Sequence, residues 1–315
     1  MTLKILWISC GVLFLIFLAV VAVHFNIVGA DSIKKISGSK ISVPHLDKNK
    51  LTKPPKETTD RDPNINAKSA ILIDVGSFKR LYAQNSDLKV PIASTTKIMT
   101  SLVVLENYHD RLGDVVTITP AMVNIEGSDI KLLPGEKITV ENLLKGLLIM
   151  SGNDTACALA LHFGGKEQFI SRMNEKAIFL GLADTHFRDP AGLDDGGYST
   201  ANDLAVLGAY AMRNEKFAEI VKIPQLTISS VDGRIPHELK NSNRMMRVEE
   251  QLYYALAIGI KTGFTNEAGH CLISAAQKDG HQILSVILNT NANTLTASAK
   301  ESKKLLEWGF ANWTW

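Results

Sequence analysis

The sequence is poor in the residues that build metal sites and disulfide frameworks. Its three cysteines, Cys10, Cys157 and Cys271, lie far apart in 315 residues and form no CxxC pair. The eight histidines are scattered, and no HExxH motif occurs. This spacing argues against the common zinc motifs and against a disulfide scaffold. We therefore expect neither a metal nor another cofactor.

An excess of charge of one sign is also missing. Lysine and arginine number 34, aspartate and glutamate 32, and the formal net charge is +2. No basic module with interleaved aromatic residues occurs, so we do not expect nucleic acid as a partner. The hydrophobic fraction of 45% is sufficient for one large core or two modest ones.

Only the N-terminus carries a long hydrophobic run. The segment from Ile5 to Val23 contains no charged residue, and about 20 apolar residues are needed to span a bilayer as a helix. Residues 1–30 are therefore predicted to be a transmembrane anchor. Small residues from Val28 to Ala30 would also suit a signal peptidase, so a cleaved signal peptide stays open.

The next segment has the composition of a linker. Residues 31–66 are rich in Lys, Pro, Ser, Thr and Asp and show little apolar periodicity, which predicts a solvated coil. Residues 67–315 are predicted to form one catalytic domain.

Strand patterns occur at both ends of this domain and helix patterns occur between them. Residues 69–85 predict a hairpin, and residues 254–290 predict three strands. Residues 114–120 and 136–150 predict short strands followed by a buried helix, and another helix is expected to start near Ser94. Further helical patterns lie at 154–163, 166–180 and 295–310. The predicted fold class is α/β (α+β): an antiparallel sheet built from both ends of the domain, helices packed on it, and a helical subdomain in the middle.

The stretch "PIASTTKIMTSL" contains a Ser-x-x-Lys pattern. A helix that begins near Ser94 places Ser94 and Lys97 on one face, so the hydroxyl and the amine can meet. By itself the pattern also fits a capping serine followed by a solvated lysine.

Two further short motifs occur in the chain. Ser-Gly-Asn, Ser151 to Asn153, follows an apolar helix, and Lys-Thr-Gly, Lys261 to Gly263, ends an apolar strand. Each is weak alone. The ordered set of Ser-x-x-Lys, a Ser-x-Asn motif and Lys-Thr-Gly is typical of penicillin-binding proteins and class A β-lactamases.

From residue 66 to about 312 the chain resembles the D-alanyl-D-alanine carboxypeptidases, the low-molecular-weight penicillin-binding serine peptidases of family S11. The similar segments include "ASTTKIMT", "SGNDTACALA", "DPAGLDDGGYSTANDLA" and "GIKTGFTNEAGHCLISAA". The resemblance implies a penicillin-binding protein or class A β-lactamase-like fold. It also implies a serine carboxypeptidase that removes the terminal D-alanine from peptidoglycan stem pentapeptides and binds β-lactam antibiotics.

The resemblance assigns roles in the reaction to four residues. Ser94 would be the nucleophile, and Lys97, in its neutral form, would be the base that activates it. Ser151 would relay a proton to the leaving amine. Asn153 would bind Lys97 and the substrate amide.

The third motif would hold the substrate. Lys261 and Thr262 would bind its terminal carboxylate, and Gly263 would let the peptide approach the strand edge. The backbone N–H groups of Ser94 and Phe264 are the oxyanion hole implied by the family.

Three alternatives were weighed against this interpretation. A β-lactamase of class A needs a Glu-x-x-Leu-Asn segment, which is missing from "ADTHFRDPAGLDDGGYST". A drug sensor needs a cytoplasmic output module, and only a few residues precede the apolar run. An inactive homologue is disfavoured by the intact motifs. The acidic "DPAGLDD" segment is interpreted as a loop near the site.

Peptidoglycan lies outside the cytoplasmic membrane. We therefore expect the catalytic domain on the extracytoplasmic side, attached to the membrane through the N-terminal segment, or secreted if that segment is cleaved.

Overall fold

The computed structural model describes residues 51–59, 62–290, 292 and 294–315. These residues belong to one compact unit. Among them, no helix is both long and apolar enough to cross a membrane. The predicted anchor, residues 1–30, and the first part of the predicted linker lie outside the described residues.

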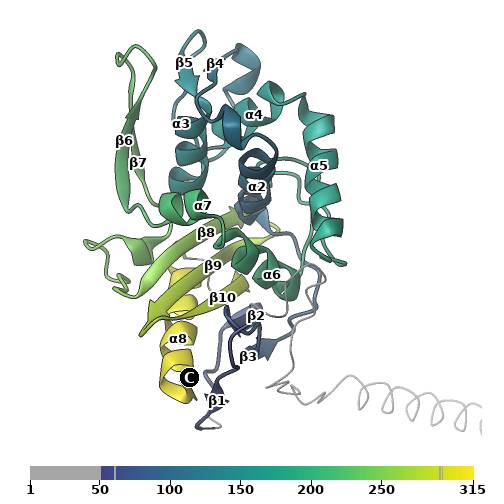
Figure 1. The fold of residues 1–315 in the computed structure, drawn as a ribbon, viewed down its shortest axis with the longest axis vertical. Helices are drawn as coiled ribbons and strands as arrows, with labels where there is room; N and C mark the ends of the chain where they lie inside the picture. The colour runs from purple at the N-terminus through teal and green to yellow at the C-terminus, as the bar shows by residue number, and fades with distance from the viewer. Residues whose placement is uncertain (1–50, 60–61, 291, 293) are drawn as a thin grey trace, which may run out of the picture. The chain divides into compact units, whose positions relative to one another are not determined.

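One five-stranded antiparallel sheet organises the domain (Figure 1), and its strand order is β3-β2-β10-β9-β8. Its strands are β2 (Ala67–Asp74), β3 (Arg80–Gln84), β8 (Ala257–Thr265), β9 (Gly269–Lys278) and β10 (His281–Thr290). The first two strands come from the start of the domain and the other three from its end. The predicted sheet built from both ends is therefore confirmed.

The central strands are apolar without alternation because both faces of the sheet are covered. On β2, Ile71 and Ile73 pack into the core that includes α6 (Ala201–Ala211), whereas Ala70 and Leu72 pack into the core that includes α8 (Ala297–Asn312). Figure 1 shows α8 and α6 on opposite faces of the sheet.

The remaining elements are helices, single turns and short strand pairs; the helices other than α8 form the helical region on one face of the sheet (Figure 1). The helices are α2 (Lys97–Asn107), α3 (Val140–Lys145), α4 (Asn153–His162), α5 (Lys166–Phe179), α6 (Ala201–Ala211), α7 (Glu215–Val221) and α8 (Ala297–Asn312). Single turns are η2 (Ala93–Thr96), η3 (His109–Arg111), η4 (Pro120–Met122), η5 (Gly146–Met150) and η6 (Arg244–Met246). Short strand pairs are β4 (Val115–Thr117) with β5 (Lys137–Thr139), and β6 (Gln225–Ser229) with β7 (Pro236–Lys240).

Helix α2 lies in the middle of the helical region (Figure 1) and is buried along nine of its eleven residues. A helix that is apolar on all sides is expected in such a place. The predicted helices occur within a few residues of their expected bounds. Helices α6 and α7 and the β6–β7 hairpin had no counterpart in the sequence prediction.

The predicted linker, residues 31–66, needs a correction in its described part. Strand β1 (Lys56–Glu57) pairs with β11 (Trp313–Thr314), and Ile65 is buried. These residues belong to the domain, which begins before residue 67. The β1–β11 pairing uses main-chain hydrogen bonds to the other end of the domain, so it could not be predicted from the polar side chains of this segment.

Candidate active site

Ser94 lies in η2, the single turn before α2, and Lys97 is the first residue of α2. The Lys97 Nζ atom is 2.8 Å from Ser94 Oγ. The N-cap residue of α2 is Thr96 and that of η2 is Ile92, so Ser94 caps neither, and Lys97 is completely buried. The geometry therefore contradicts the simple alternative of a capping serine and a solvated lysine.

Three oxygen atoms surround the Lys97 amine. Besides Ser94 Oγ, they are Asn153 Oδ1 at 2.7 Å and the carbonyl oxygen of Ala191 at 2.7 Å. An amide or peptide carbonyl oxygen only accepts hydrogen bonds, so a neutral amine donates its two protons to these two oxygens. Its lone pair then faces Ser94, the one group of the three that can donate a proton.

Burial lowers the pKa of Lys97 to about 7, although the carboxylates of Asp189 and Asp154 oppose the shift. An ordinary lysine is neutral in roughly one molecule in 2,500 at pH 7. With a pKa of about 7, about half of the molecules carry the neutral amine at that pH.

The loop 189–194 supplies the Ala191 carbonyl. The Asp189 carboxylate accepts the N–H groups of Ala191 and Gly192, each at 2.7 Å, and that of Asp194 at 2.8 Å. A Cβ atom on Gly192, whose φ is +80°, would lie 1.9 Å from the Ala93 carbonyl oxygen. The acidic loop thus packs against the Ser94 turn, which confirms its interpretation as a loop near the site.

The Ser-Gly-Asn motif forms the turn between η5 and α4. Ser151 has a left-handed backbone conformation, with φ of 70°. Asn153 donates through Nδ2 to the Glu126 carbonyl at 2.6 Å and through its backbone N–H to the Ser128 carbonyl at 2.7 Å. The Asn153 side chain is therefore fixed with its oxygen toward Lys97.

The Lys-Thr-Gly motif lies on β8, the edge strand of the sheet. A Cβ atom on Gly263 would lie 3.0 Å from the Ile92 carbonyl oxygen and 3.1 Å from the Ser94 nitrogen. A glycine therefore allows the strand to lie against the serine turn. Thr262 donates to Ser242 Oγ at 2.7 Å.

Lys261, predicted to bind the terminal carboxylate of the substrate, lies beneath the surface of β8. Its side chain is completely buried and its Nζ donates to the Thr262 carbonyl at 3.0 Å. Burial, and then the charge of Lys97, lower its pKa well below the ordinary value. Lys261 thus lies behind the strand edge and close to Lys97.

A cavity of about 480 Å³ opens at this place. Six of the eight predicted residues line it, namely Ser94, Ser151, Asn153, Thr262, Gly263 and Phe264, whereas Lys97 and Lys261 lie beneath its surface. We name this space the reaction cavity. No aspartate or glutamate is among its described lining residues. Within the described part of the chain, no cluster of three or more His, Cys, Asp or Glu side chains could hold a metal ion.

Sequence reasoning missed several groups of this site. The reaction cavity is also lined by Ser242, Arg244 and Arg247. Both arginines bind the same Glu250 oxygen, Arg244 at 2.7 Å and Arg247 at a shorter distance. The segment "NSNRMMR" contains these residues, and its two arginines were the signal that could have placed positive charge at this wall.

A serine hydrogen-bonded to a buried lysine, beside a second serine and an edge strand, defines the class of serine acyl-transfer enzymes that use a lysine base. The chain belongs to the D-alanyl-D-alanine carboxypeptidase family, peptidase family S11, which it matches over residues 56–292.

Known proteins support this assignment. The chain is 34% identical to the D-alanyl-D-alanine carboxypeptidase DacF of Bacillus subtilis strain 168, over 78% of this chain but 63% of that protein. It is 31% identical to a D-alanyl-D-alanine endopeptidase of Pseudomonas aeruginosa, over 81% of this chain and 82% of that one. The crystal structure of the Streptomyces K15 DD-transpeptidase matches with a TM-score of 0.74 and 34% identity, over 80% of this chain and 100% of that one. The predicted penicillin-binding protein fold is thereby confirmed.

Proposed function

We propose that this protein is a serine-type D-Ala-D-Ala carboxypeptidase, which removes the terminal D-alanine from peptidoglycan stem pentapeptides through an acyl-enzyme on Ser94. The observation that carries the proposal is the 2.8 Å contact between Ser94 Oγ and the completely buried Lys97 Nζ. This contact places a base that is neutral in about half of the molecules at pH 7 beside the hydroxyl.

Acylation begins when Ser94 Oγ attacks the carbonyl carbon of the penultimate D-alanine. The hydroxyl proton passes to Lys97 Nζ, and the resulting ammonium donates to Ser94, Asn153 and Ala191, the three contacts described above. The carbon–nitrogen bond then breaks, and the departing D-alanine amine receives a proton. Ser151, which lines the same cavity, relays that proton from Lys97.

The developing oxyanion needs hydrogen-bond donors where its charge appears. We assign them to the backbone N–H groups of Ser94 and Phe264, which lie on the two segments brought together at Gly263. Because β8 is an edge strand, the peptide can add to it as a further strand.

The terminal carboxylate is assigned to the end of the reaction cavity formed by Thr262, Ser242, Arg244 and Arg247. Lys261 acts from beneath the strand, since its amine is completely buried and donates to the Thr262 carbonyl. A bound carboxylate would favour the ammonium form of Lys261, which then attracts it. A carboxylate there would meet hydroxyl and guanidinium donors, which form the stronger charge-assisted hydrogen bonds.

Water then releases the acyl group. A β-lactamase would need a carboxylate that activates this water for rapid loss of penicillin, and the described walls of the reaction cavity offer none. Transfer to an amine is the competing outcome, since one similar protein is named a DD-transpeptidase. Hydrolysis is preferred here because the sequence also matches proteins named as carboxypeptidases, such as DacF.

The predicted location follows from this substrate. We propose that residues 1–30 attach the protein to the cytoplasmic membrane, or direct its secretion if they are cleaved, with the catalytic domain outside. The polymer that carries the stem peptides lies on that side.

The test uses the full chain with penicillin and with a diacyl-Lys-D-Ala-D-Ala peptide. We expect one penicilloyl adduct, mapped to Ser94, and release of a single D-alanine from the peptide. Ser94→Ala should do neither. An adduct at another residue, or peptide transfer without release of a shortened acid, would contradict the proposal.

A further inference from the structure

Residues 126–132 form an irregular segment, without helix or strand, beside the Ser-Gly-Asn turn. Two of its carbonyl groups hold Asn153: that of Glu126 accepts the Asn153 side-chain amide at 2.6 Å, and that of Ser128 accepts its backbone N–H at 2.7 Å. The Asn153 oxygen in turn accepts from Lys97 at 2.7 Å. The hydrogen bond between these two residues therefore depends on where the 126–132 segment lies.

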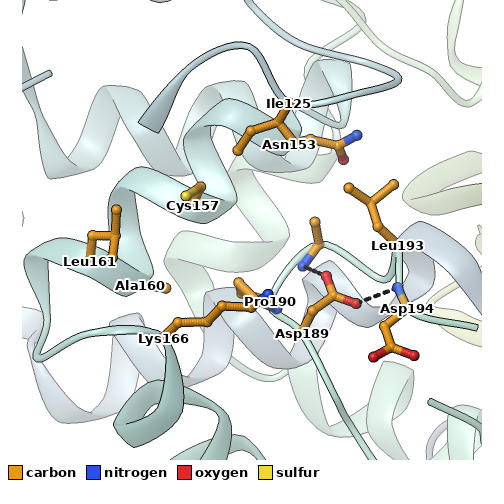
Figure 2. Close-up of a pocket in the computed structure, with 11 residues that line it drawn as sticks. Ile125, Asn153, Cys157, Ala160, Leu161, Lys166, Asp189, Pro190, Leu193 and Asp194 are labelled. Carbon is orange, nitrogen blue, oxygen red and sulfur yellow. Dashed lines mark hydrogen bonds between the residues drawn. The ribbon is translucent and has the colours of Figure 1, made fainter. Parts of the chain in front are cut away.

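The next residue of the chain, Asp154, binds the same segment. Its buried carboxylate accepts the N–H groups of Ile130 at 3.1 Å and Leu132 at 3.2 Å. Figure 2 shows Ile125, the residue before the segment, beside Asn153 at the start of α4. The segment is thus joined to the start of α4 at every second residue.

A buried histidine holds the other side of the segment. His237 lies on β7, and its Nδ1 atom is 2.8 Å from the Ile130 carbonyl oxygen. Ile130 is therefore bound through its N–H by Asp154 and through its carbonyl by His237. Lys131 follows with a φ of 63°, a conformation that is uncommon for a residue with a side chain. The segment needs such contacts to keep its shape.

Glu136 orients the His237 ring from its other nitrogen. Nε2 is 2.7 Å from Glu136 Oε1, and the two side chains are only 3% and 0% exposed. The second carboxylate oxygen of Glu136 accepts the Leu133 N–H at 3.0 Å. The ring is thus fixed at both nitrogen atoms, in a place that excludes water.

The partners of the ring determine where its protons lie. A peptide carbonyl only accepts, so Nδ1 of His237 carries a proton and donates to Ile130. One more proton lies between Nε2 and Glu136. Either the doubly protonated ring donates to the carboxylate, or the carboxylic acid donates to the neutral ring. In both arrangements the Ile130 carbonyl keeps its donor.

We propose that His237 and Glu136 are positioning residues for the acylation step. They hold the Ile130 carbonyl, and with it the segment whose carbonyl groups direct the Asn153 oxygen toward Lys97. Neither residue is among those that line the reaction cavity, so both act through other groups. The proposal goes beyond the proposed function but rests on it, because it takes Lys97 as the base.

Two substitutions of His237 separate the two contacts of the ring. The amide nitrogen of asparagine can take the place of Nδ1, whereas that of glutamine, on a longer side chain, can take the place of Nε2. His237→Asn therefore keeps the donor to Ile130 and loses the contact with Glu136. His237→Gln does the reverse, and His237→Ala loses both contacts.

The experiment measures the rate of Ser94 acylation by penicillin in the full chain, followed by intact mass. The final fraction of penicilloyl protein counts the competent molecules, so each rate refers to these alone. We expect His237→Gln and His237→Ala to react about five- to thirty-fold more slowly, as for the loss of a buried hydrogen bond. His237→Asn should stay within about threefold of the unaltered chain, because it keeps that bond.

The melting temperature should show the opposite order for the same two variants. His237→Asn leaves the buried Glu136 side chain without its partner, whereas His237→Gln leaves only a peptide carbonyl unsatisfied. An unsatisfied charged group costs more stability than a neutral one. A purely structural role would instead make the rate follow the melting temperature.

Variants at two carboxylates serve as controls. Glu136→Gln keeps both hydrogen bonds, because its amide nitrogen donates to His237 and its oxygen accepts from Leu133. It should keep the rate that Glu136→Ala lowers. Glu301→Ala removes a buried carboxylate on α8, which accepts the Asn66 N–H at 3.0 Å on the other face of the sheet. It should lower the melting temperature and leave the rate unchanged.

The outcomes distinguish this inference from its alternatives. Equal rates in all His237 variants, or a slower rate in His237→Asn than in His237→Gln, would refute the positioning role. With the diacyl-Lys-D-Ala-D-Ala peptide, we expect His237→Gln to lower kcat with little change in KM. A raised KM with unchanged kcat would show that the ring acts through Ser242, which follows β7, and would also refute it. Absence of acylation in the unaltered chain would instead refute the proposed function.

Discussion

The pKa of Lys97 is the property on which acylation most depends, and it can be moved by one substitution. Asn153→Asp places a carboxylate oxygen where the amide oxygen now lies, 2.7 Å from Lys97 Nζ. An opposite charge at this range favours the ammonium form of the lysine and raises its pKa by about 1–3 units.

The sign of the effect follows from the role of the base. Only the neutral amine takes the Ser94 proton, so acylation rises with pH and levels off above the pKa of Lys97, which is about 7. In Asn153→Asp the midpoint should move to about 8–10. At pH 7 the neutral fraction, and with it the acylation rate, should fall about five- to five-hundred-fold.

The assay is the second-order rate of penicillin acylation, followed by intact mass between pH 5 and pH 9. Asn153→Ala is the control without added charge: it loses the Asn153 hydrogen bond to the Glu126 carbonyl, as Asn153→Asp does, and also the oxygen that accepts from Lys97. Its midpoint should not rise. An unaltered enzyme whose rate still increases tenfold per unit up to pH 9, or an Asp variant with an unshifted midpoint, would refute Lys97 as the neutral base.

Three further predictions concern the acyl group, the carboxylate and the membrane. The penicilloyl adduct should persist for minutes, because none of the described residues that line the reaction cavity carries a carboxylate; repeated turnover of penicillin in the intact-mass assay would contradict this. Lys261→Ala should reduce kcat/KM about ten- to a hundred-fold for a peptide acid, the size expected for the attraction between opposite charges below the surface, but much less for the peptide amide. If the losses from mutation and amidation simply multiply, Lys261 does not act on the carboxylate. Deletion of residues 1–30 should release the protein from membranes in a fractionation assay, whereas a mature N-terminus at Asp31 would identify a signal peptide.

The local sequence determined the outline of the fold and the identity of the residues proposed to react. Hydrophobic periodicity and turn residues within each segment predict the β2–β3 hairpin, the last three strands of the sheet and α8. Ser94 and Lys97 are one helical turn apart, so their meeting is a property of the helix itself. The Ser-Gly-Asn and Lys-Thr-Gly motifs could be recognised because each consists of three consecutive residues.

Tertiary structure decided what depends on contacts between distant segments. Lys97 donates to the main-chain carbonyl of Ala191. Every residue type has such a carbonyl, so the sequence cannot predict this contact. The lowered pKa of Lys97 results from complete burial by several elements, and the burial of Lys261 behind β8 has the same origin. The pairing of β1 with β11 joins the two ends of the domain through peptide groups. Such interactions arise only when the folded chain removes water from groups far apart in sequence.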